Sequence, residues 1–434
     1  MSYPQAVAAV AASSVGPPAH PGDMTQTLAA GDDLPQTHPD QQPDLVIRAG
    51  SPTALLQLVP HLMGFVPAAS LVVIGTAPPR DRVRVTLRYD LPDPPGLGVS
   101  ADIAAHAVGV LQTQQLTAAV AVGYGPETLV TPVAEGLRDA AARAAIDLHE
   151  FLRVQDGRYW SYVCGNEACC PAAGVPFDAT AALADAAADP ADAAADPFDA
   201  PADPAEPAAL ADAAALAEAA LAGIGGPVLA SRADLAAQVA PLGGITAESM
   251  RQATRRAEQH VARLLAKVRK SSRLGAARQM IAAEGLAAVG AMITRYRGGG
   301  RFTSDDEIAR ITVALRDLRV RDDAWARMDP GHGAAHLRLW TDVVRRAQPG
   351  YVAAPAALLA FLAWQSGHGA LANVALDRAL ADDPRYSMAT LLRQVITAGA
   401  PPALARLPMT PEEVAASYDG RDVDGQDPEM HDED

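Results

Sequence analysis

The stretch SLVVIGTAPPRDRVRVTLRY, residues 70–89, decides the fold of the first part of the chain. Residues 70–75 are almost continuously apolar, which predicts a buried β-strand. Residues 82–89 alternate strictly between basic or polar and apolar side chains. That alternation predicts a half-exposed strand with its basic face outward. Residues 77–81 have the length of a hairpin connection, so we expect these two strands to form a hairpin.

The flanking segments extend this hairpin into an α/β domain over residues 44–178. Before it, Leu45-Val-Ile47 predicts a strand. Ser51-Pro52 predicts a helix start, because serine caps helices and proline suits the first helical position. Pro60 is expected to kink or break that helix, and Gly64 suits its end. After the hairpin we expect helices at about 100–114 and 131–145, a strand at 118–122, and a closing hairpin of 151–154 with 158–163.

The second half of the chain, residues 221–405, has a helical pattern. Ser304-Asp-Asp-Glu307 is a capping box, and the remaining helices are expected near 334–347, 355–366, 370–381 and 387–398. Five residues have the spacing of a tetratricopeptide unit: Gly367, Ala372, Leu376, Ala379 and Pro384. Ala360 and Ala363 depart from that motif, so an ordinary helical bundle stays open as the alternative. The predicted fold class is α+β: a mixed-sheet α/β domain followed by a helical-hairpin domain.

The net charge of −16 is unevenly distributed along the chain. Residues 1–43, 182–216 and 411–434 carry net charges of −4, −8 and −9, so the remainder carries +5. Like-charged, Pro- and Ala-rich segments usually stay solvated. We therefore predict a disordered leader at 1–43, a low-complexity insert at 179–220 and an acidic disordered tail at 406–434.

Targeting and membrane signals are weak. No lysine or arginine precedes Arg48, and a secretory signal would need a basic start. The best apolar run, Val352–Trp364, is too short to span a bilayer. The expectation is a cytoplasmic protein with reduced thiols and no membrane partner.

The three cysteines are clustered as Cys164, Cys169 and Cys170. Thiolates bind metals or attack electrophiles, so the cluster has three interpretations: a metal site, a reactive thiol, or small buried structural residues. A closed zinc site needs four ligands, and adjacent cysteines do not easily occupy two tetrahedral corners. His149 or His61 would have to supply the missing ligand. The structural interpretation is preferred here, and no metal is assigned.

A basic amphipathic helix is expected within residues 251–273. Its basic face consists of Arg256, Arg263, Lys267 and Lys270. A basic face of this kind could contact a phosphate backbone, be simply solvated, or bind the chain's own acidic segments. A solvated face is the preferred interpretation, which makes nucleic acid a less favoured partner.

Other catalytic patterns give no assignment. His61 and Ser70 suggest a Ser–His pair, but Ser70 precedes a strand rather than occupying a strand-to-helix elbow. The sequence has no Walker loop, no G-x-G-x-x-G and no H-E-x-x-H motif. We therefore predict no catalytic residues and no cofactor.

Three stretches together resemble those of a known protein family. They are PHLMGFVPAASLV at 60–72, WSYVC at 160–164 with CCPAAG at 169–174, and the helical run 337–392. The chain resembles the actinobacterial domain of unknown function 4192 family over most of residues 44–400. The resemblance carries over no catalytic residue. It implies that the functional loops contain His61, Gly64, Phe65, Pro67, Ser70, Trp160, Cys164, Cys169, Cys170, Pro171 and Gly174.

The functional prediction from the sequence is a non-enzymatic protein-binding, scaffold or regulatory protein, whose helical half presents a groove to a protein partner. The alternative is a Cys/His-dependent enzyme or metal-binding protein that uses the cysteine cluster and His61. A third hypothesis is a nucleic-acid-associated protein that uses the basic helix.

Overall fold

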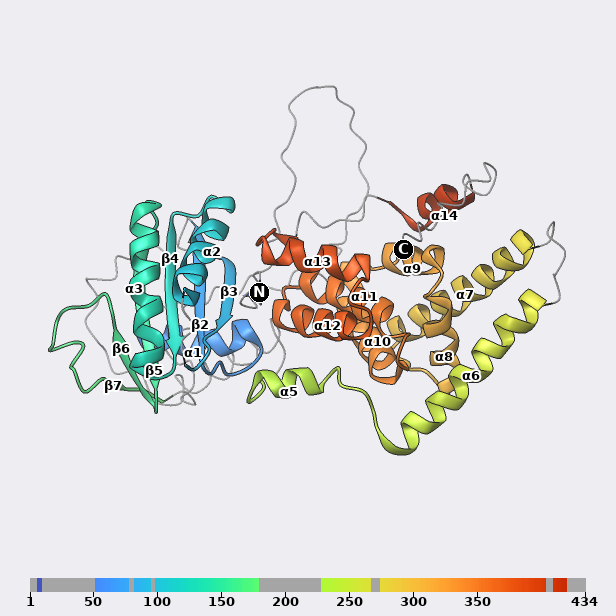
Figure 1. The fold of residues 1–434 in the computed structure, drawn as a ribbon, viewed down its shortest axis with the longest axis horizontal. Coiled ribbons are helices and arrows are strands. Elements are labelled where there is room, and N and C mark those ends of the chain that lie inside the picture. The colour runs from blue at the N-terminus through green and yellow to red at the C-terminus, as the bar shows by residue number, and fades with distance from the viewer. Residues whose placement is uncertain are drawn as a thin grey trace, which may run out of the picture.

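The computed structural model describes residues 6–9, 51–77, 82–94, 98–178, 228–266, 274–402 and 409–419. Figure 1 shows an α/β part at one end of the molecule and a helical part at the other. The predicted insert at 179–220 lies outside the described residues. Within the predicted leader, Ala6–Ala9 forms β1, and within the predicted tail, Pro411–Asp419 forms α14.

The α/β part is built on one sheet with the strand order β1-β3-β2-β4-β5-β6-β7. Only β4 and β5 pair in parallel among these strands; the other neighbours are antiparallel. The predicted hairpin of residues 70–89 is confirmed as the β2–β3 pair. The strands after β1 are β2 (Ser70–Ala77), β3 (Arg82–Asp90), β4 (Ala118–Tyr124), β5 (Asp147–Gln155), β6 (Arg158–Ser161) and β7 (Val175–Pro176).

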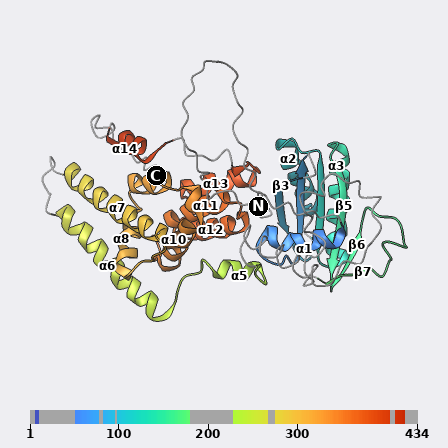
Figure 2. The ribbon, with the colours of Figure 1, turned by 180° about the vertical axis from the view of Figure 1, so that it is seen from behind.

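Helices cover both faces of the sheet. On one face lie α2 (Val99–Thr113) and α3 (Glu127–Arg143). Gly75 lets β2 approach α2, because a Cβ at this position would lie 2.5 Å from the Leu111 side chain. On the other face α1 (Pro52–Met63) lies across the strands, as Figure 2 shows.

The ends of α1 follow the predicted signals. The Oγ atom of Ser51 accepts a hydrogen bond from the N–H of Ala54 at 3.2 Å, and Pro52 is the first helical residue. Gly64 ends the helix with a φ of 75°, a left-handed conformation that glycine adopts without strain. Pro60 does not break the helix, which continues to Met63.

The predicted exposure of the polar face of β3 is wrong for Thr86 and Arg88. Thr86 and Arg88, on the polar face of the strand, are 2% and 3% exposed. The Arg88 guanidinium forms an ion pair with Asp90 at 2.6 Å and lies over the Phe65 ring, 5.5 Å from its centroid. The alternation does distinguish an apolar and a polar face of the strand. The polar face, which was expected to be in solvent, is covered at Arg88 by Phe65 from the segment after α1.

The predicted helices of the second half are confirmed. Ser304 makes no side-chain capping bond, and Glu307 instead accepts the N–H of Thr303 at 2.6 Å, so the capping box is only partly formed. Before α14, the helices are α5 (Arg232–Ala237), α6 (Gly244–Ala266), α7 (Leu274–Arg297), α8 (Asp305–Ala314), α9 (Leu318–Ala326), α10 (Gly333–Arg346), α11 (Ala353–Gln365), α12 (Gly369–Asp382) and α13 (Ser387–Thr397). None of the described helices is both long and apolar enough to cross a membrane.

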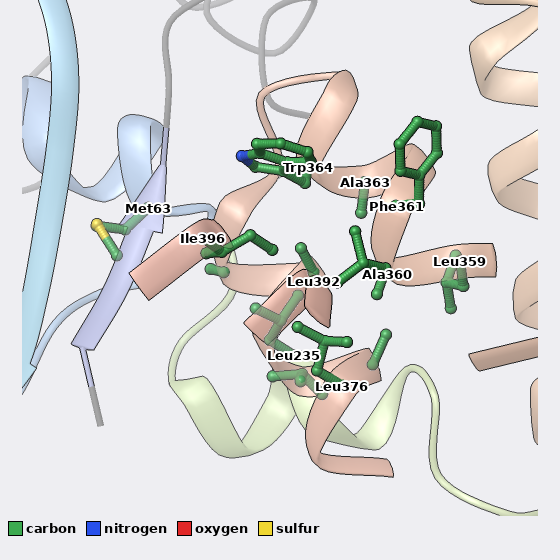
Figure 3. Close-up of a cluster of buried hydrophobic side chains, with 14 of the residues drawn as sticks. Met63, Leu235, Leu359, Ala360, Phe361, Ala363, Trp364, Leu376, Leu392 and Ile396 are labelled. Atoms are coloured by element: carbon green, nitrogen blue, oxygen red, sulfur yellow. The ribbon is translucent and has the colours of Figure 1, made fainter. Parts of the chain in front are cut away.

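Helices α11 and α12 form a closely packed pair in the core of the helical part. Alanines let the two backbones approach, and Ala360, Ala363, Ala372 and Ala379 are fully buried. Figure 3 shows Leu376 gathered with side chains of α11 and α13 in this cluster. The pairing expected from the tetratricopeptide-like spacing is therefore present in this segment.

The α/β and helical parts meet where α2 faces the end of α13. His106 donates from Nε2 to the carbonyl of Thr397 at 2.9 Å and accepts at Nδ1 from the Tyr89 hydroxyl at 2.8 Å. The side-chain amide of Gln114 donates to the carbonyl of Gly399. This contact depends on Gly399, because a Cβ there would clash with Val110.

We predict that Gly399→Ala destabilises the protein by about 1–3 kcal/mol more than Gly350→Ala. Both glycines have left-handed φ angles, 71° and 82°, so both substitutions strain the backbone. Only Gly399 faces a neighbouring side chain, since a Cβ at Gly350 meets open space. Urea unfolding of the two variants measures the difference, and equal destabilisation would show that this contact contributes nothing.

Candidate functional site

The cysteine cluster lies in the loop between β6 and β7. Ser161, the last residue of β6, fixes the start of this loop. Its Oγ accepts the N–H groups of Val163 and Cys164 at 3.1 and 2.9 Å and donates to Glu150 on β5 at 2.7 Å. The chain therefore leaves the sheet in a defined turn at Cys164.

The three cysteines converge. The Sγ atoms of Cys164, Cys169 and Cys170 all lie within 4.8 Å of one another. The carbonyl of Asn166 accepts the N–H groups of Cys169 and Cys170 at 3.0 and 2.7 Å, and this turn brings both adjacent cysteines back towards Cys164. The two adjacent sulfurs, which were not expected to occupy two corners of one tetrahedral site easily, therefore lie close to the third. Cys164 and Cys170 are half-buried, and Cys169 is exposed.

The local environment shifts the pKa values of two of the thiols in opposite directions. A backbone hydrogen bond from Asn166 and a side-chain bond from Cys170 lower the pKa of Cys164. Burial, with the neighbouring Cys164 and Cys169 adding to it, raises the pKa of Cys170 to about 12. Of these two thiols Cys164 consequently ionises more readily, while Cys170 holds its proton unless a cation replaces it.

Trp160 and Gly174 support the far end of the cysteine loop. The Trp160 Nε1–H donates to the carbonyl of Ala172 at 2.9 Å, and the Arg153 guanidinium lies 3.7 Å from a Trp160 ring centroid. Gly174 has a φ of 75°, and a Cβ there would lie 2.5 Å from the indole. The carbonyl of Pro171 accepts the Gly174 N–H at 2.8 Å. These predicted site residues hold the loop and do not contribute metal ligands.

The predicted Gly64–Ser70 turn lies at the opposite end of α1 from the cysteine loop. Thr53, near the start of α1, hydrogen-bonds Tyr159 of β6, whereas Phe65, after its end, lies under Arg88 of β3. Twelve helical residues span about 18 Å. The two loops that the sequence grouped together are therefore separated by the length of this helix.

Neither predicted histidine joins the cysteine group. His61 is in the last turn of α1, and His149 pairs with Asp147 at 3.3 Å. The Ser70 hydroxyl is fully buried and has no hydrogen-bond partner among the described residues, so it forms no Ser–His pair. Within those residues, the metal-ligating group consists of the three cysteines.

A second group of polar residues includes the predicted site residue Ser70, but its grouping with Arg88 and Tyr124 was not predicted. Ser70 pairs in register with Asp90 on one side and with Tyr124 on the other. The hydroxyls of Ser70 and Tyr124 and two nitrogens of Arg88 are buried without hydrogen-bond partners in the described residues. These side chains come from three separate strands, so only the sheet register reveals them. Phe65, which lies against Arg88, and Pro67 are both buried.

The predicted basic surface is described in part. Arg256 forms an ion pair with Asp306 of α8 at 2.7 Å, and Arg263 is exposed. Lys267 and Lys270 lie outside the described residues, since the described part of α6 ends at Ala266. One of the four basic side chains is therefore engaged within the protein itself.

The comparisons with known proteins bear on the family and not on the activity. Comparisons with curated proteins and with solved structures gave no match. The family model described as a domain of unknown function, DUF4192, matches residues 52–197 and 197–403. These two segments include α1, the cysteine loop and α6–α13. Because the match covers most of the chain, this protein belongs to the DUF4192 family.

Proposed function

We propose that this protein is a non-enzymatic, metal-binding regulatory or scaffold protein, with the ion held by Cys164, Cys169 and Cys170. The convergence of the three sulfurs is the observation that carries the proposal. Tetrahedral zinc, with Zn–S bonds of about 2.3 Å, requires sulfurs about 3.8 Å apart. The Cys169 and Cys170 sulfurs are 3.8 Å apart.

Zinc is the first candidate ion, because thiolates favour zinc and softer cations over magnesium or calcium. When bound, zinc would neutralise thiolates that otherwise repel one another, and would hold Cys170 deprotonated. Three protein ligands leave a fourth position to water or to an external group. The bound ion would then hold the loop in one conformation.

A metal-dependent enzyme is the second candidate, since an open zinc position can activate water. It has less support in the geometry. The described group contains no histidine or carboxylate beside the sulfurs that could act as a general base. Glu150, the nearest acid on β5, is engaged with Ser161 and with the N–H of Phe151.

Two further aspects of the proposal concern partner and location. We assign partner binding to the helical part, with a protein as the favoured partner and nucleic acid as a weaker one, since Arg256 is already paired with Asp306. The cytoplasm is the compartment that suits the protein, because thiolate ligands must stay reduced.

Metal analysis of anaerobically purified protein tests the site. We expect one zinc per chain in the wild type, and loss of that zinc in Cys164→Ser and in Cys169→Ser. Glu167→Gln is the matched control, because Glu167 is an exposed residue of the same loop that supplies no ligand. Zinc affinity should rise with pH as protons leave the thiols.

Two results would contradict the proposal. One is a wild-type protein that binds no stoichiometric metal even after anaerobic reconstitution with zinc. The other is a Glu167→Gln variant that loses metal as completely as the cysteine variants, which would place the ion elsewhere.

A further inference from the structure

A cleft of about 390 Å³ opens in the helical part, where the start of α6 meets the ends of α10 and α12. Its wall contains four arginines, Arg251, Arg345, Arg346 and Arg378, and a single acid, Asp382. Pockets of this size hold small organic ligands. The cleft is separate from the cysteine loop, which contributes no residue to its wall.

The single acid does not neutralise these arginines directly. The Asp382 carboxylate accepts the N–H groups of Gly350, Val352 and Ala353, at 2.7, 2.9 and 3.1 Å. These donors lie at the start of α11, where unpaired N–H groups and the helix dipole attract negative charge. Asp382 therefore acts as a cap of α11.

Two of the four arginines have partners on their own helices. Arg251 pairs with Glu248 on α6. Arg346 approaches Asp342 on α10 at 3.4 Å and stacks over the Phe302 ring at 4.3 Å from its centroid. These contacts fix the two guanidinium groups at the rim of the cleft.

Arg345 and Arg378 are different. Both are half-buried, and their side chains form no hydrogen bond or ion pair with the residues that the structure describes. The Nε atom of each is shielded from solvent and has no acceptor, as is also true of Arg346, but of the four arginines only Arg345 and Arg378 have no partner at their other guanidinium nitrogens in the part of the chain that the structure describes. A buried guanidinium nitrogen without an acceptor costs free energy, because it has lost water and gained nothing in exchange. An anion in the cleft can reach the Nη atoms of both side chains, which are not shielded and have no acceptor among the described residues.

We propose that this cleft binds a small phosphorylated molecule, with Arg345 and Arg378 as the principal ligands of its phosphate. The planar guanidinium matches the oxygens of a phosphate in pairs, which favours phosphate over a point-like anion such as chloride. The remaining wall, including Leu242, Met250 and Val352, is apolar and suits the carbon skeleton of the ligand.

Titration of the full-length protein with inorganic pyrophosphate tests the cleft, using calorimetry against sodium chloride of equal ionic strength. We expect Arg345→Gln and Arg378→Gln each to weaken binding by about 10-fold or more, since charge-assisted hydrogen bonds are lost. Arg263→Gln is the matched control. It removes the same charge from an exposed position of α6 outside the cleft.

A second measurement needs no variant. Pyrophosphate should protect Arg345 and Arg378 of the wild type from modification by phenylglyoxal, as mapped by mass spectrometry, and leave Arg263 as reactive as before. Equal weakening of binding by Arg263→Gln would overturn the proposal, because it would show a general attraction to positive charge. Pyrophosphate binding that sodium chloride reproduces, or modification without protection, would overturn it as well.

Discussion

Replacing Leu376 with alanine is expected to lower the free energy of unfolding by about 2–5 kcal/mol. Leu376 is fully buried in α12, where it fills space between this helix and its neighbours α11 and α13 (Figure 3). Alanine removes buried methyl groups and leaves a cavity, and the neighbouring alanines Ala360 and Ala363 are too small to fill it. Urea unfolding followed by circular dichroism measures the loss.

Leu391→Ala is the matched control for this prediction. It removes the same atoms from α13, but Leu391 is 60% exposed, so the expected change is within about 0.5 kcal/mol. Because the protein has two parts, its unfolding is expected to show more than one transition, and the comparison belongs to the transition of the helical part. A similar effect of the two substitutions would mean that Leu376 does not lie in a closely packed core.

The α11–α12 pair was predictable because its signals are local. Small residues recur at helical spacing, Gly367 stands between the helices, and Pro384 follows the second one. The same holds for α1, whose start at Ser51-Pro52 and end at Gly64 are fixed by residues at the helix ends themselves. Turn and capping chemistry depends on neighbours in the chain, which a sequence shows directly.

The burial of Arg88 was not predictable, because it depends on a contact distant in the sequence. Alternation in β3 correctly separates two faces, but it cannot show whether another segment covers the polar one. Phe65, from the segment after α1, supplies that cover. The proximity of Tyr124 to the predicted site residue Ser70 was not predictable for the same reason, since only strand register makes them neighbours.

The geometry of the two candidate sites was likewise not predictable from the sequence. The cysteine cluster was visible in the sequence, but its geometry depends on one turn, in which the Asn166 carbonyl bonds both following cysteine amides. The arginine cleft was not visible, because Arg345 and Arg378 are separated by 33 positions and belong to different helices. The basic face predicted from the sequence lies along a single helix, within residues 251–273. Arg345 and Arg378 instead lie on two different helices and line the cleft between them.

The second large effect expected is acid destabilisation, which arises from histidines that the fold keeps neutral. His336 of α10 is 1% exposed and accepts a hydrogen bond from Arg297 at 3.2 Å. Burial first, and the Arg297 charge second, lower its pKa from 6.5 to about 4. Burial also lowers the pKa of His106, at the contact between the two parts, and of His368 before α12.

The sign follows from proton binding in the two states. Between pH 6.5 and about 4 the unfolded chain binds a proton at His336 that the folded protein does not, so stability falls as the pH falls through this window. The full loss from His336 is about 3 kcal/mol, at roughly 1.4 kcal/mol for each pKa unit. His106 and His368 add to the loss in the same direction.

A separate carboxylate effect begins at lower pH, so the two can be resolved. Burial of Glu307 opposes its ionisation, but the N–H of Thr303 and the Arg295 guanidinium outweigh burial and lower its pKa to about 2. The stabilisation from Glu307 is therefore lost mainly below about pH 4.5, where this residue is more than half protonated in the unfolded chain. Destabilisation measured from pH 7 to about 5 must come from the histidines rather than from this ion pair.

His336→Gln tests the assignment, because glutamine can still accept the Arg297 hydrogen bond but does not titrate. We expect the variant to be less stable than wild type near pH 7 and to lose less stability on acidification, so that the two curves converge. Urea unfolding at several pH values between about 7 and 4.5 gives both curves. Parallel curves would show that His336 takes up its proton equally well in the folded and unfolded protein. The neutral, buried state that Arg297 and the surrounding helices impose on it would then make no contribution to the pH dependence.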